Sequence, residues 1–258
     1  MDISIVIVSW NVKDLLRKCL RTIYQSQHRL TVEVFVVDNA STDGTAKMVE
    51  QEFSSAVLIT NKQNRGFAAA NNQAIAQSTG RYVLALNPDT ELTADTLQRM
   101  IDFMNQNERV GIAGCQHRNA DGSLQPSVRR LPTVGAMLLI TTKLAKLWPN
   151  APALRVYLAT DFDYQITQPA PQVAGSFLLM RRELIEKIGS FDERFFIWFE
   201  EVDLCRRAAR AGWGVWYCTD ATIIHHGGQS FKQQLAVRKQ ALFFKSAMRY
   251  FKKHGFHG

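Results

Sequence analysis

The chain has 258 residues, of which 46% are hydrophobic and 21% are charged. This composition is typical of a globular protein and excludes an intrinsically disordered chain. No apolar run approaches the roughly 20 residues of a membrane-spanning helix, and the N-terminus lacks the positive charges of a signal peptide. We therefore expect a soluble, cytoplasmic protein whose four cysteines, none in a CxxC pair, are reduced and buried.

The net charge of +8 comes from the C-terminal end of the chain. Asp220 is the last acidic residue, and seven Lys or Arg residues follow it. Without those seven, the chain carries 24 bases and 23 acids. The basic character therefore belongs to a tail, residues 231–258.

The first half alternates short apolar runs with helical patterns. The runs predict strands at residues 3–8, 32–37, 57–60, 82–86 and 110–115. The patterns between them predict helices at 12–27, 42–53, 67–78 and 93–107, with Thr93 as the N-cap of the last. This alternation predicts an α/β fold with a mainly parallel sheet covered by helices on both faces, which binds ligands beyond the carboxyl ends of its strands.

The second half is less regular. An Asp-Gly pair predicts a turn at 119–123, and an apolar stretch predicts a helix at 131–148. Residues 149–171 hold four of the seven prolines and predict a flexible loop. Beyond it, the pattern predicts a strand at 173–180, a helix at 200–211, and two short strands at 214–217 and 222–225.

Polar clusters follow three of the predicted strands: Ser9-Trp10-Asn11, residues 38–44, and Asn87-Pro88-Asp89. Such residues often form turns or cap helices, and for Thr42 and Asp43 that role is as plausible as a role in ligand binding. Asp38 and Asp89, however, directly follow apolar strands, where a carboxylate can bind a ribose, a base edge or a cation held with phosphates. The absence of GxGxxG and GxxxxGK[ST] motifs argues against dinucleotide dehydrogenases and P-loop NTPases.

Seven motifs, in order over residues 2–230, resemble the family 2 inverting glycosyltransferases, and most closely the bacterial rhamnosyltransferase-like members that build lipopolysaccharide and other surface polysaccharides. They are VSWN at 8–11, VVDNASTDGT at 36–45, NRGFAAANN at 64–72, LNPDTEL at 86–92, GSFLLMRR at 175–182, FDERFFIWFEEVDLCRR at 191–207 and HHGGQS at 225–230. Seven motifs in this order are far more specific than any one of them.

The resemblance implies a GT-A fold: one domain over residues 1–230, with a nucleotide-sugar half at 1–115 and an acceptor half at 116–230, followed by a basic amphipathic helix at 231–258. In this analogy, Ser9 and Asn11 line the nucleotide site and Asp38 holds the base or ribose. A donor-side loop is formed by Asn64, Gly66 and Phe67.

The family's Asp-x-Asp metal motif corresponds here to Asn87-Pro88-Asp89. Asp89 would be the main protein ligand of Mg²⁺ or Mn²⁺, because the carboxamide of Asn87 binds such ions more weakly. His225 matches the first histidine of a family motif near the diphosphate or metal. Gly227 and Gly228 after it would let backbone N–H groups approach the diphosphate.

The chemistry of inversion needs a carboxylate that takes the proton of the attacking hydroxyl, and no covalent nucleophile. The run Glu200-Glu201-Val202-Asp203 supplies carboxylates, although acids at a helix start are also favoured by the helix dipole. The resemblance matches Glu201 to the catalytic acid of the family, with Glu in place of Asp, and leaves Glu200 as a competing candidate. Asp203 could instead form a structural ion pair with Arg206 or Arg207.

Together these features predict transfer of rhamnose from dTDP-rhamnose to a lipid-linked glycan acceptor. One alternative is a UDP-hexose donor on the same scaffold. The other is an inactive membrane-binding module, against which the intact Asp38, Asp89 and Glu200-Glu201 argue. No aromatic and basic interleaving supports nucleic-acid binding.

The tail also permits two interpretations. Its basic stripe and adjoining apolar sector predict either a helix docked on the domain or one lying in the anionic inner leaflet of the plasma membrane. We favour the second, which would make the protein peripheral on that membrane.

Overall fold

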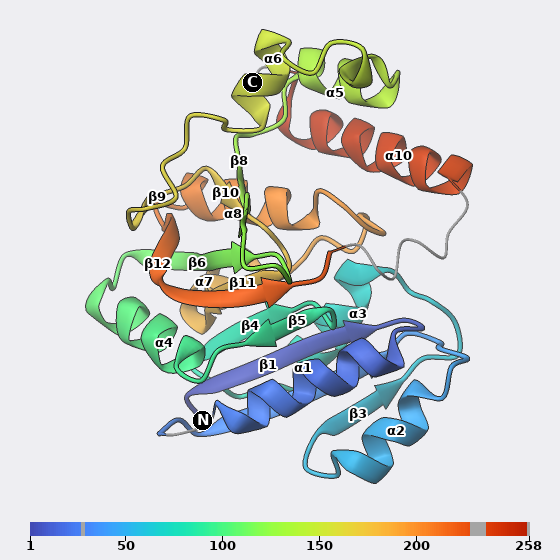
Figure 1. Ribbon diagram of the computed structural model, residues 1–258, viewed down its shortest axis with the longest axis vertical. Coiled ribbons are helices and arrows are strands. Elements are labelled where there is room, and N and C mark those ends of the chain that lie inside the picture. The colour runs from blue at the N-terminus through green and yellow to red at the C-terminus, as the bar shows by residue number, and fades with distance from the viewer. Residues whose placement is uncertain (27–28, 228–235, 257–258) are drawn as a thin grey trace.

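The structure is a computed structural model that describes residues 1–26, 29–227 and 236–256. One ten-stranded sheet runs through the molecule, with helices on both faces (Figure 1). Its strands follow the order β3-β2-β1-β4-β11-β6-β12-β5, with β7 and β9 added beside β6 and β12, and β8 and β10 form a separate pair.

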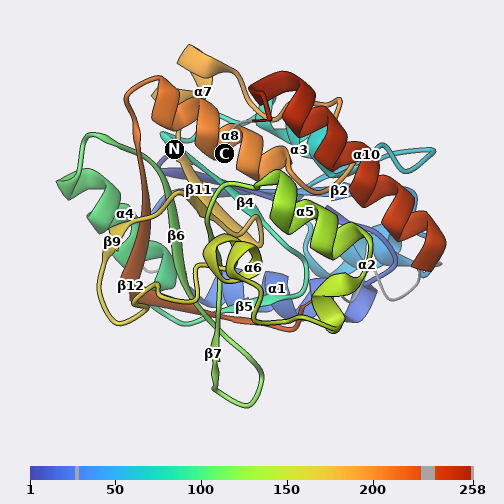
Figure 2. The same ribbon diagram turned by 90° about the horizontal axis from the view of Figure 1, so that it is seen from above.

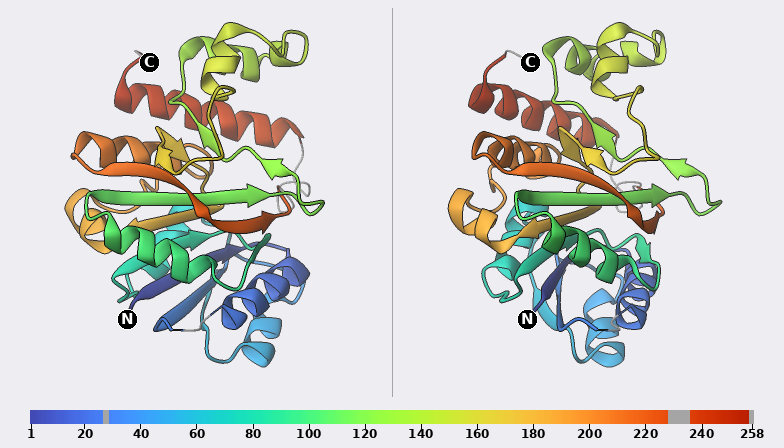
Figure 3. Two further views of the ribbon diagram at one scale, coloured as in Figure 1. Left: turned by 60° about the vertical axis from the view of Figure 1, so that its left-hand side comes forward. Right: turned by 90° about the vertical axis from the view of Figure 1, so that its left-hand side faces the viewer.

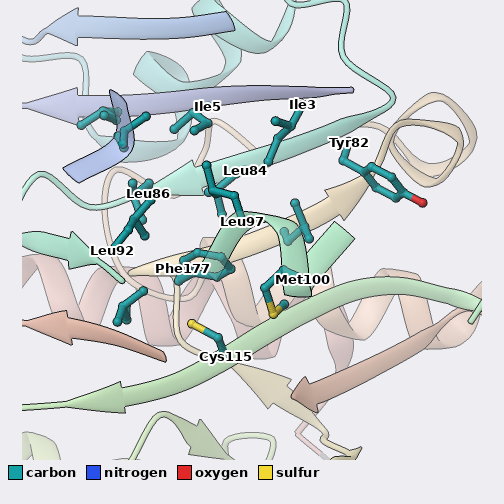
Figure 4. Close-up of a cluster of buried hydrophobic side chains, with 14 of the residues drawn as sticks. Ile3, Ile5, Tyr82, Leu84, Leu86, Leu92, Leu97, Met100, Cys115 and Phe177 are labelled. Atoms are coloured by element: carbon teal, nitrogen blue, oxygen red, sulfur yellow. The ribbon is translucent and has the colours of Figure 1, made fainter. Parts of the chain in front are cut away.

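Residues 1–86 fold into the strands and helices that their sequence predicts. Four parallel strands, β1 (Ile3–Ser9), β2 (Val32–Asp38), β3 (Val57–Thr60) and β4 (Tyr82–Leu86), lie side by side. They are connected through α1 (Lys13–Gln25), α2 (Thr45–Glu52) and α3 (Phe67–Ile75). Apolar side chains from β1, β4 and β11 pack against α4 in one layer of the core (Figure 4).

The middle of the chain completes the sheet. It contributes β5 (Thr90–Leu92), α4 (Thr96–Gln106), β6 (Val110–Arg118) and β7 (Leu124–Gln125). The predicted turn at 119–123 closes the β6–β7 hairpin. Thr93 is not the N-cap of α4, because the helix begins at Thr96 after Asp95.

Strand β11 (Phe177–Arg181) inserts between β4 and β6 and is antiparallel to both. The strand predicted at 173–180 is therefore two strands, since β10 (Gln172–Val173) pairs instead with β8 (Val128–Arg129). Conversely, the two strands predicted at 214–225 are one, β12 (Gly214–His225), with an irregularity between Cys218 and Thr222.

Residues 131–171 are the part that the sequence predicts worst. The predicted helix at 131–148 is α5 (Val134–Thr141) and the short helix η1 (Leu144–Lys146), separated by Lys143 in the left-handed region at φ 65°. The predicted loop at 149–171 contains α6 (Pro152–Tyr157), which begins with proline at its first turn, and β9 (Gln168–Pro169). Proline at that position starts a helix because its missing N–H would have no partner there.

The last helices are α7 (Arg182–Ile188), α8 (Glu200–Arg210) and α10 (Ala236–His254). Helix α10 lies beyond α8, at the end of the molecule opposite the N-terminus (Figure 3). Its Ala247, Tyr250 and Phe251 are buried in a third apolar cluster with residues of α5 and α8. The domain therefore covers this part of the apolar sector, whereas Phe244 of the same sector is 54% exposed. Membrane binding by the helix stays a prediction.

Three further predictions concern the cysteines, membrane-spanning helices and the domain boundary. The four cysteines are free and buried, as expected. In the described ranges, no helix combines the length and hydrophobicity needed to cross a bilayer. The predicted boundary between residues 230 and 231, and the GGQS motif beyond Gly227, lie outside the described residues.

Candidate active site

The ends of β1 and β2 bring three predicted site residues together. Ser9 pairs in register with Asp38, and both are buried. Asn11, with a positive φ of 53°, accepts a hydrogen bond from Thr42 N at 2.7 Å and donates its own N–H to Ser41 Oγ at 2.9 Å. The loops that follow β1 and β2 are thereby joined into one preorganised edge.

A buried amide attaches the predicted donor-side loop to this edge. Asn39, 2% exposed, donates through Nδ2 to Asn64 Oδ1 at 3.0 Å and to Gly66 O at 3.2 Å. Its Oδ1 accepts from Arg65 N at 3.0 Å. Sequence reasoning assigned Asn39 no role, although the residue directly follows Asp38.

The same loop touches the segment that leads into α8. Gly66 has a φ of +84°, and a Cβ there would collide with the backbone of Phe196. Phe67 N donates to Phe196 O at 2.7 Å. The donor-side loop and the Glu200-Glu201 segment are therefore held against each other, although they lie about 130 residues apart.

The Asn87-Pro88-Asp89 motif is fixed by its backbone at the end of β4. Asn87 N donates to Ser176 O at 3.0 Å. Asp89 is 6% exposed, and its carbonyl accepts from His226 N at 2.9 Å. This contact brings the end of β12, and His225 with it, beside Asp89.

The hydrogen bonds of Gln125 define the tautomer of His225. Gln125 Nε2 donates to Asn119 Oδ1 at 2.8 Å and to His225 O at 3.3 Å, so its Oε1 is the atom that faces His225 Nδ1, at 2.7 Å. Because Oε1 only accepts, Nδ1 carries the proton of this bond, and Nε2 is the ring atom left to bind a cation. Nε2 is buried, has no hydrogen-bond partner among the described residues, and lies 3.4 Å from Asp89 Oδ1.

This arrangement fits a divalent cation. A nitrogen lone pair and a carboxylate oxygen at that separation repel each other unless a proton or a cation lies between them. Two such donors can bind one ion at about 2.1 Å each. The described ranges contain no group of three or more metal-binding side chains, so an ion here would take its remaining ligands from diphosphate oxygens and water.

Two residues that sequence reasoning missed support this site. The ring of His117 packs edge-on against that of His225, with centroids 5.8 Å apart. Burial lowers the pKa of His117 to about 3, so its ring is neutral. Nδ1 donates to Cys115 O at 2.9 Å, and Nε2 accepts from Ser176 Oγ at 2.7 Å. Ser176 thus connects His117 to the Asn87 backbone; it lies within the GSFLLMRR motif, whereas no local pattern marked His117.

The two candidate bases differ in what they face. Helix α8 begins directly after Trp198 and Phe199, both in the left-handed region. Glu201 lines a cavity of about 240 Å³. Glu200, 5% exposed, is not among the described residues that line it. The cavity also contains Ser127, Arg129, Tyr157, Gln172 and Gly175.

Burial raises the pKa of both carboxyl groups, and for Glu200 the neighbouring charge of Glu201 raises it further. In the described part of the chain, Oε2 of each glutamate and Oγ of Ser127 are buried without hydrogen-bond partners. A carboxylate with a raised pKa that opens onto a cavity is suited to accept a proton. Glu200, with the higher pKa, is suited to remain neutral.

Asp203 has a structural role, as the sequence allowed. It is fully buried, with Oδ2 2.8 Å from Arg207 Nε and Oδ1 2.7 Å from both Lys253 Nζ and His254 Nε2. The predicted ion pair is confirmed for Arg207. Arg206 instead donates to Tyr250 Oη at 2.9 Å. Asp203 therefore holds α10 against α8.

Comparison with known proteins identifies the family. The sequence profile of glycosyl transferase family 2 matches residues 4–189. The chain belongs to this family. This family 2 glycosyltransferase is 30% identical over 241 residues to N-acetylglucosaminyl-diphospho-decaprenol L-rhamnosyltransferase of Mycobacterium tuberculosis, covering 88% of this chain and 77% of that protein. It is 26% identical over 240 residues to rhamnosyltransferase WbbL of Escherichia coli, covering 89% and 86%.

Solved structures show the fold of this family 2 glycosyltransferase. Mannosyltransferase PcManGT of Pyrobaculum calidifontis, with GDP-Man and Mn²⁺, superimposes with a TM-score of 0.64 at 21% identity over 96% of this chain. GalNAc-T7, with UDP, GalNAc and Mn²⁺, gives 0.67 at 15% identity over 87%. This chain spans 64% and 43% of those two chains. The predicted family, the GT-A fold and the glycosyltransferase activity are confirmed.

Proposed function

We propose that this protein transfers L-rhamnose from dTDP-rhamnose, with inversion, to a glycan acceptor on a lipid carrier for surface polysaccharide synthesis. The observation that carries the proposal is the near full-length similarity to a rhamnosyltransferase whose name specifies a diphospho-decaprenol acceptor. WbbL, also a rhamnosyltransferase by name, supports the same donor. A lipid-linked acceptor would place the enzyme at the cytoplasmic face of the plasma membrane.

The donor would bind along the strand ends. Ser9, Asn11 and Asp38 form the preorganised edge that would hold the base and ribose. The loop of Asn64, Gly66 and Phe67, tied to that edge by Asn39, would border the donor. A carboxylate at a strand end is well placed to accept hydrogen bonds from ribose hydroxyls.

The diphosphate would lie at Asp89 and His225, with Asn87 beside them. These two side chains would hold Mg²⁺ or Mn²⁺, while Gln125 orients the His225 ring through Nδ1. A bound divalent cation stabilises the negative charge that develops on a diphosphate leaving group.

The acceptor would enter the cavity that Glu201 lines. Its hydroxyl would donate a proton to Glu201 as it attacks the anomeric carbon, on the face opposite the leaving diphosphate. Ser127 Oγ, which has no partner in the described part of the chain, could bond a second acceptor hydroxyl, and Arg129 supplies a positive charge. A neutral Glu200 would avoid repulsion with the ionised Glu201.

A UDP-hexose donor remains the alternative. The chain is 24% identical over 229 residues to hexosyltransferase Agl10 of Haloferax volcanii, and this alignment covers 87% of this chain. The same scaffold would then bind a uracil base at Asp38.

Thermal shift with a panel of nucleotide sugars separates the two donors. We expect dTDP-rhamnose with Mg²⁺ to raise the Tm most, because a ligand at 100 times its Kd stabilises a protein by about 2.7 kcal/mol. Transfer of rhamnose to a prenyl-diphosphate-linked sugar would then be measured directly. A larger shift with UDP-hexoses, together with transfer of that hexose, would replace the proposal by its alternative.

Asp89→Ala is expected to weaken metal binding by at least ~10–100-fold, and donor binding with it, because it removes the charged ligand of the site. The measurement is donor affinity in Mg²⁺ and in EDTA. Asp102→Ala, an exposed carboxylate on α4, is the control and should respond to Mg²⁺ like the wild type. A normal Mg²⁺ response in Asp89→Ala would remove Asp89 from the metal site.

A further inference from the structure

An exposed apolar surface covers one end of the molecule. We define the α5–α6 cap as residues 131–157, which include α5, η1 and α6. Its large apolar side chains Leu138, Leu144, Leu147, Trp148 and Val156 are 57%, 48%, 83%, 61% and 49% exposed. Single exposed apolar residues are common, but several on one folded segment make it a candidate interaction surface.

The charges of the cap have one sign. Residues 131–160 contain no Asp or Glu, whereas Lys143, Lys146 and Arg155 lie among the apolar side chains. In the chain, Leu144 directly follows Lys143, and the pair Leu147-Trp148 directly follows Lys146. Apolar anchors beside Lys and Arg are the combination found in segments that lie in the interface of anionic bilayers, where tryptophan is also enriched.

Helix α10 packs against the cap through its buried side. The two are joined by a hydrogen bond from Gln240 Nε2 to Thr141 O, and Figure 2 shows α5 between α6 and α10. At 100° per residue, Arg238, Lys245, Arg249 and Lys252 form a stripe on the side of α10 opposite its buried Ala247 and Tyr250. The sequence predicted the apolar anchors and the bases on α10 alone. In the structure α10 keeps its bases and an exposed Phe244, and the cap carries the larger exposed apolar group.

The cap is also connected to the candidate acceptor cavity. Tyr157, the last residue of α6, lines that cavity with Glu201. Its carbonyl accepts from Arg130 N at 2.9 Å, and Arg130 pairs with Asp161 at 2.6 Å. A surface bound by the cap would therefore lie close to the Glu201 cavity.

We propose that the α5–α6 cap is the element of this protein that inserts into an anionic bilayer. Leu138, Leu144, Leu147 and Trp148 enter the interface between headgroups and acyl chains, while Lys143 and Lys146 contact lipid phosphates. A second copy of this chain is a poorer partner, because it would bring two all-basic surfaces together. The inference rests on the proposed function in one respect: membrane binding would serve to bring the enzyme to a lipid-linked acceptor.

The test uses full-length protein and vesicles of phosphatidylcholine with and without 30% phosphatidylglycerol. The wild type is expected to sediment with the anionic vesicles and to dissociate as salt rises. The double variant Leu147→Glu, Trp148→Glu should bind them at least tenfold more weakly. Val57→Glu is the matched control, because Val57 is 44% exposed on β3, at the other end of the molecule, and it should bind like the wild type.

A second measurement does not depend on that variant. Brominated lipids should quench tryptophan fluorescence in the wild type and much less in Trp148→Phe. Equal quenching, or equal vesicle binding by the double variant and the wild type, would overturn the proposal. So would a change from dimer to monomer in the double variant without any vesicle binding by the wild type, since the cap would then be a contact between copies.

Donor binding, measured without vesicles, separates this inference from the proposed function. The cap variants should retain the wild-type thermal shift with dTDP-rhamnose. If the protein binds anionic vesicles through the cap but no dTDP-sugar, the membrane inference stands and the proposed donor is wrong.

Discussion

Glu201→Gln is expected to lower kcat by roughly 10²–10⁴-fold and to leave donor affinity nearly unchanged. The amide matches the carboxylate in size but cannot accept the proton of the attacking hydroxyl. Donor binding should persist, because Glu201 lines the acceptor cavity and not the edge formed by Ser9 and Asp38. The measurement compares single-turnover transfer with donor affinity in the same preparation.

Glu200→Gln is the matched control, one residue away on the same helix. We expect a much smaller effect, since Glu200 does not line the cavity, and burial and the charge of Glu201 raise its pKa and favour its neutral form. A full rate in Glu201→Gln with a large loss in Glu200→Gln would assign the base to Glu200.

The raised pKa of Glu201 also predicts a pH dependence. A base must be deprotonated to act, so kcat should fall as pH decreases through this pKa. Because burial raises the pKa, the fall should begin above the ordinary range of a glutamate. Glu201→Gln should lose this limb of the profile.

The donor half could be predicted from sequence because its signals are local. Apolar runs buried on both faces mark β1, β2 and β4, and a polar residue at the end of such a run must lie at the ligand edge of a parallel sheet. Asp38 and Asp89 were found in this way. The cap was not, because a single left-handed residue, Lys143, divides an apolar stretch whose composition alone fits one helix.

The rest of the site depends on pairings between distant residues. Ser176 reaches Asn87 only because β11 inserts antiparallel between β4 and β6. Gln125 reaches His225, 100 residues away, only because the β6–β7 hairpin lies beside the end of β12. Neither periodicity nor motif spacing encodes such pairings, so Gln125, His117 and Ser127 carried no signal.

The C-terminal helix illustrates a different ambiguity. An amphipathic pattern states that a face is apolar but not whether a bilayer or the domain covers it. The ion pairs of Asp203 fix α10 on the domain, and its partners Lys253 and His254 lie about 50 residues further along the chain. The sequence indicated an ion pair within α8, and the structure extends it to α10.

Asp203→Asn is therefore expected to lower the free energy of unfolding by about 3–5 kcal/mol, the usual cost of removing one partner from a buried ionic network. Arg207, Lys253 and His254 would be left facing a neutral amide. Urea denaturation at pH 7 measures the change. Asp161→Asn, which breaks the exposed pair with Arg130, is the control and should change stability far less.

The same network predicts how stability depends on pH. Burial raises the pKa of Asp203, but hydrogen bonds from Lys253, Arg207 and His254 outweigh burial and hold it below its ordinary value. A group whose pKa is lower in the folded state contributes its full stabilisation when the pH is above its pKa in the unfolded chain, which is about 3.9 for Asp. This contribution disappears as the pH falls through the pKa of the folded state. Wild-type stability should thus decline below about pH 4, and the decline should be shallower in Asp203→Asn. If Asp203→Asn were no less stable than Asp161→Asn at pH 7, α10 would be held by its apolar face alone.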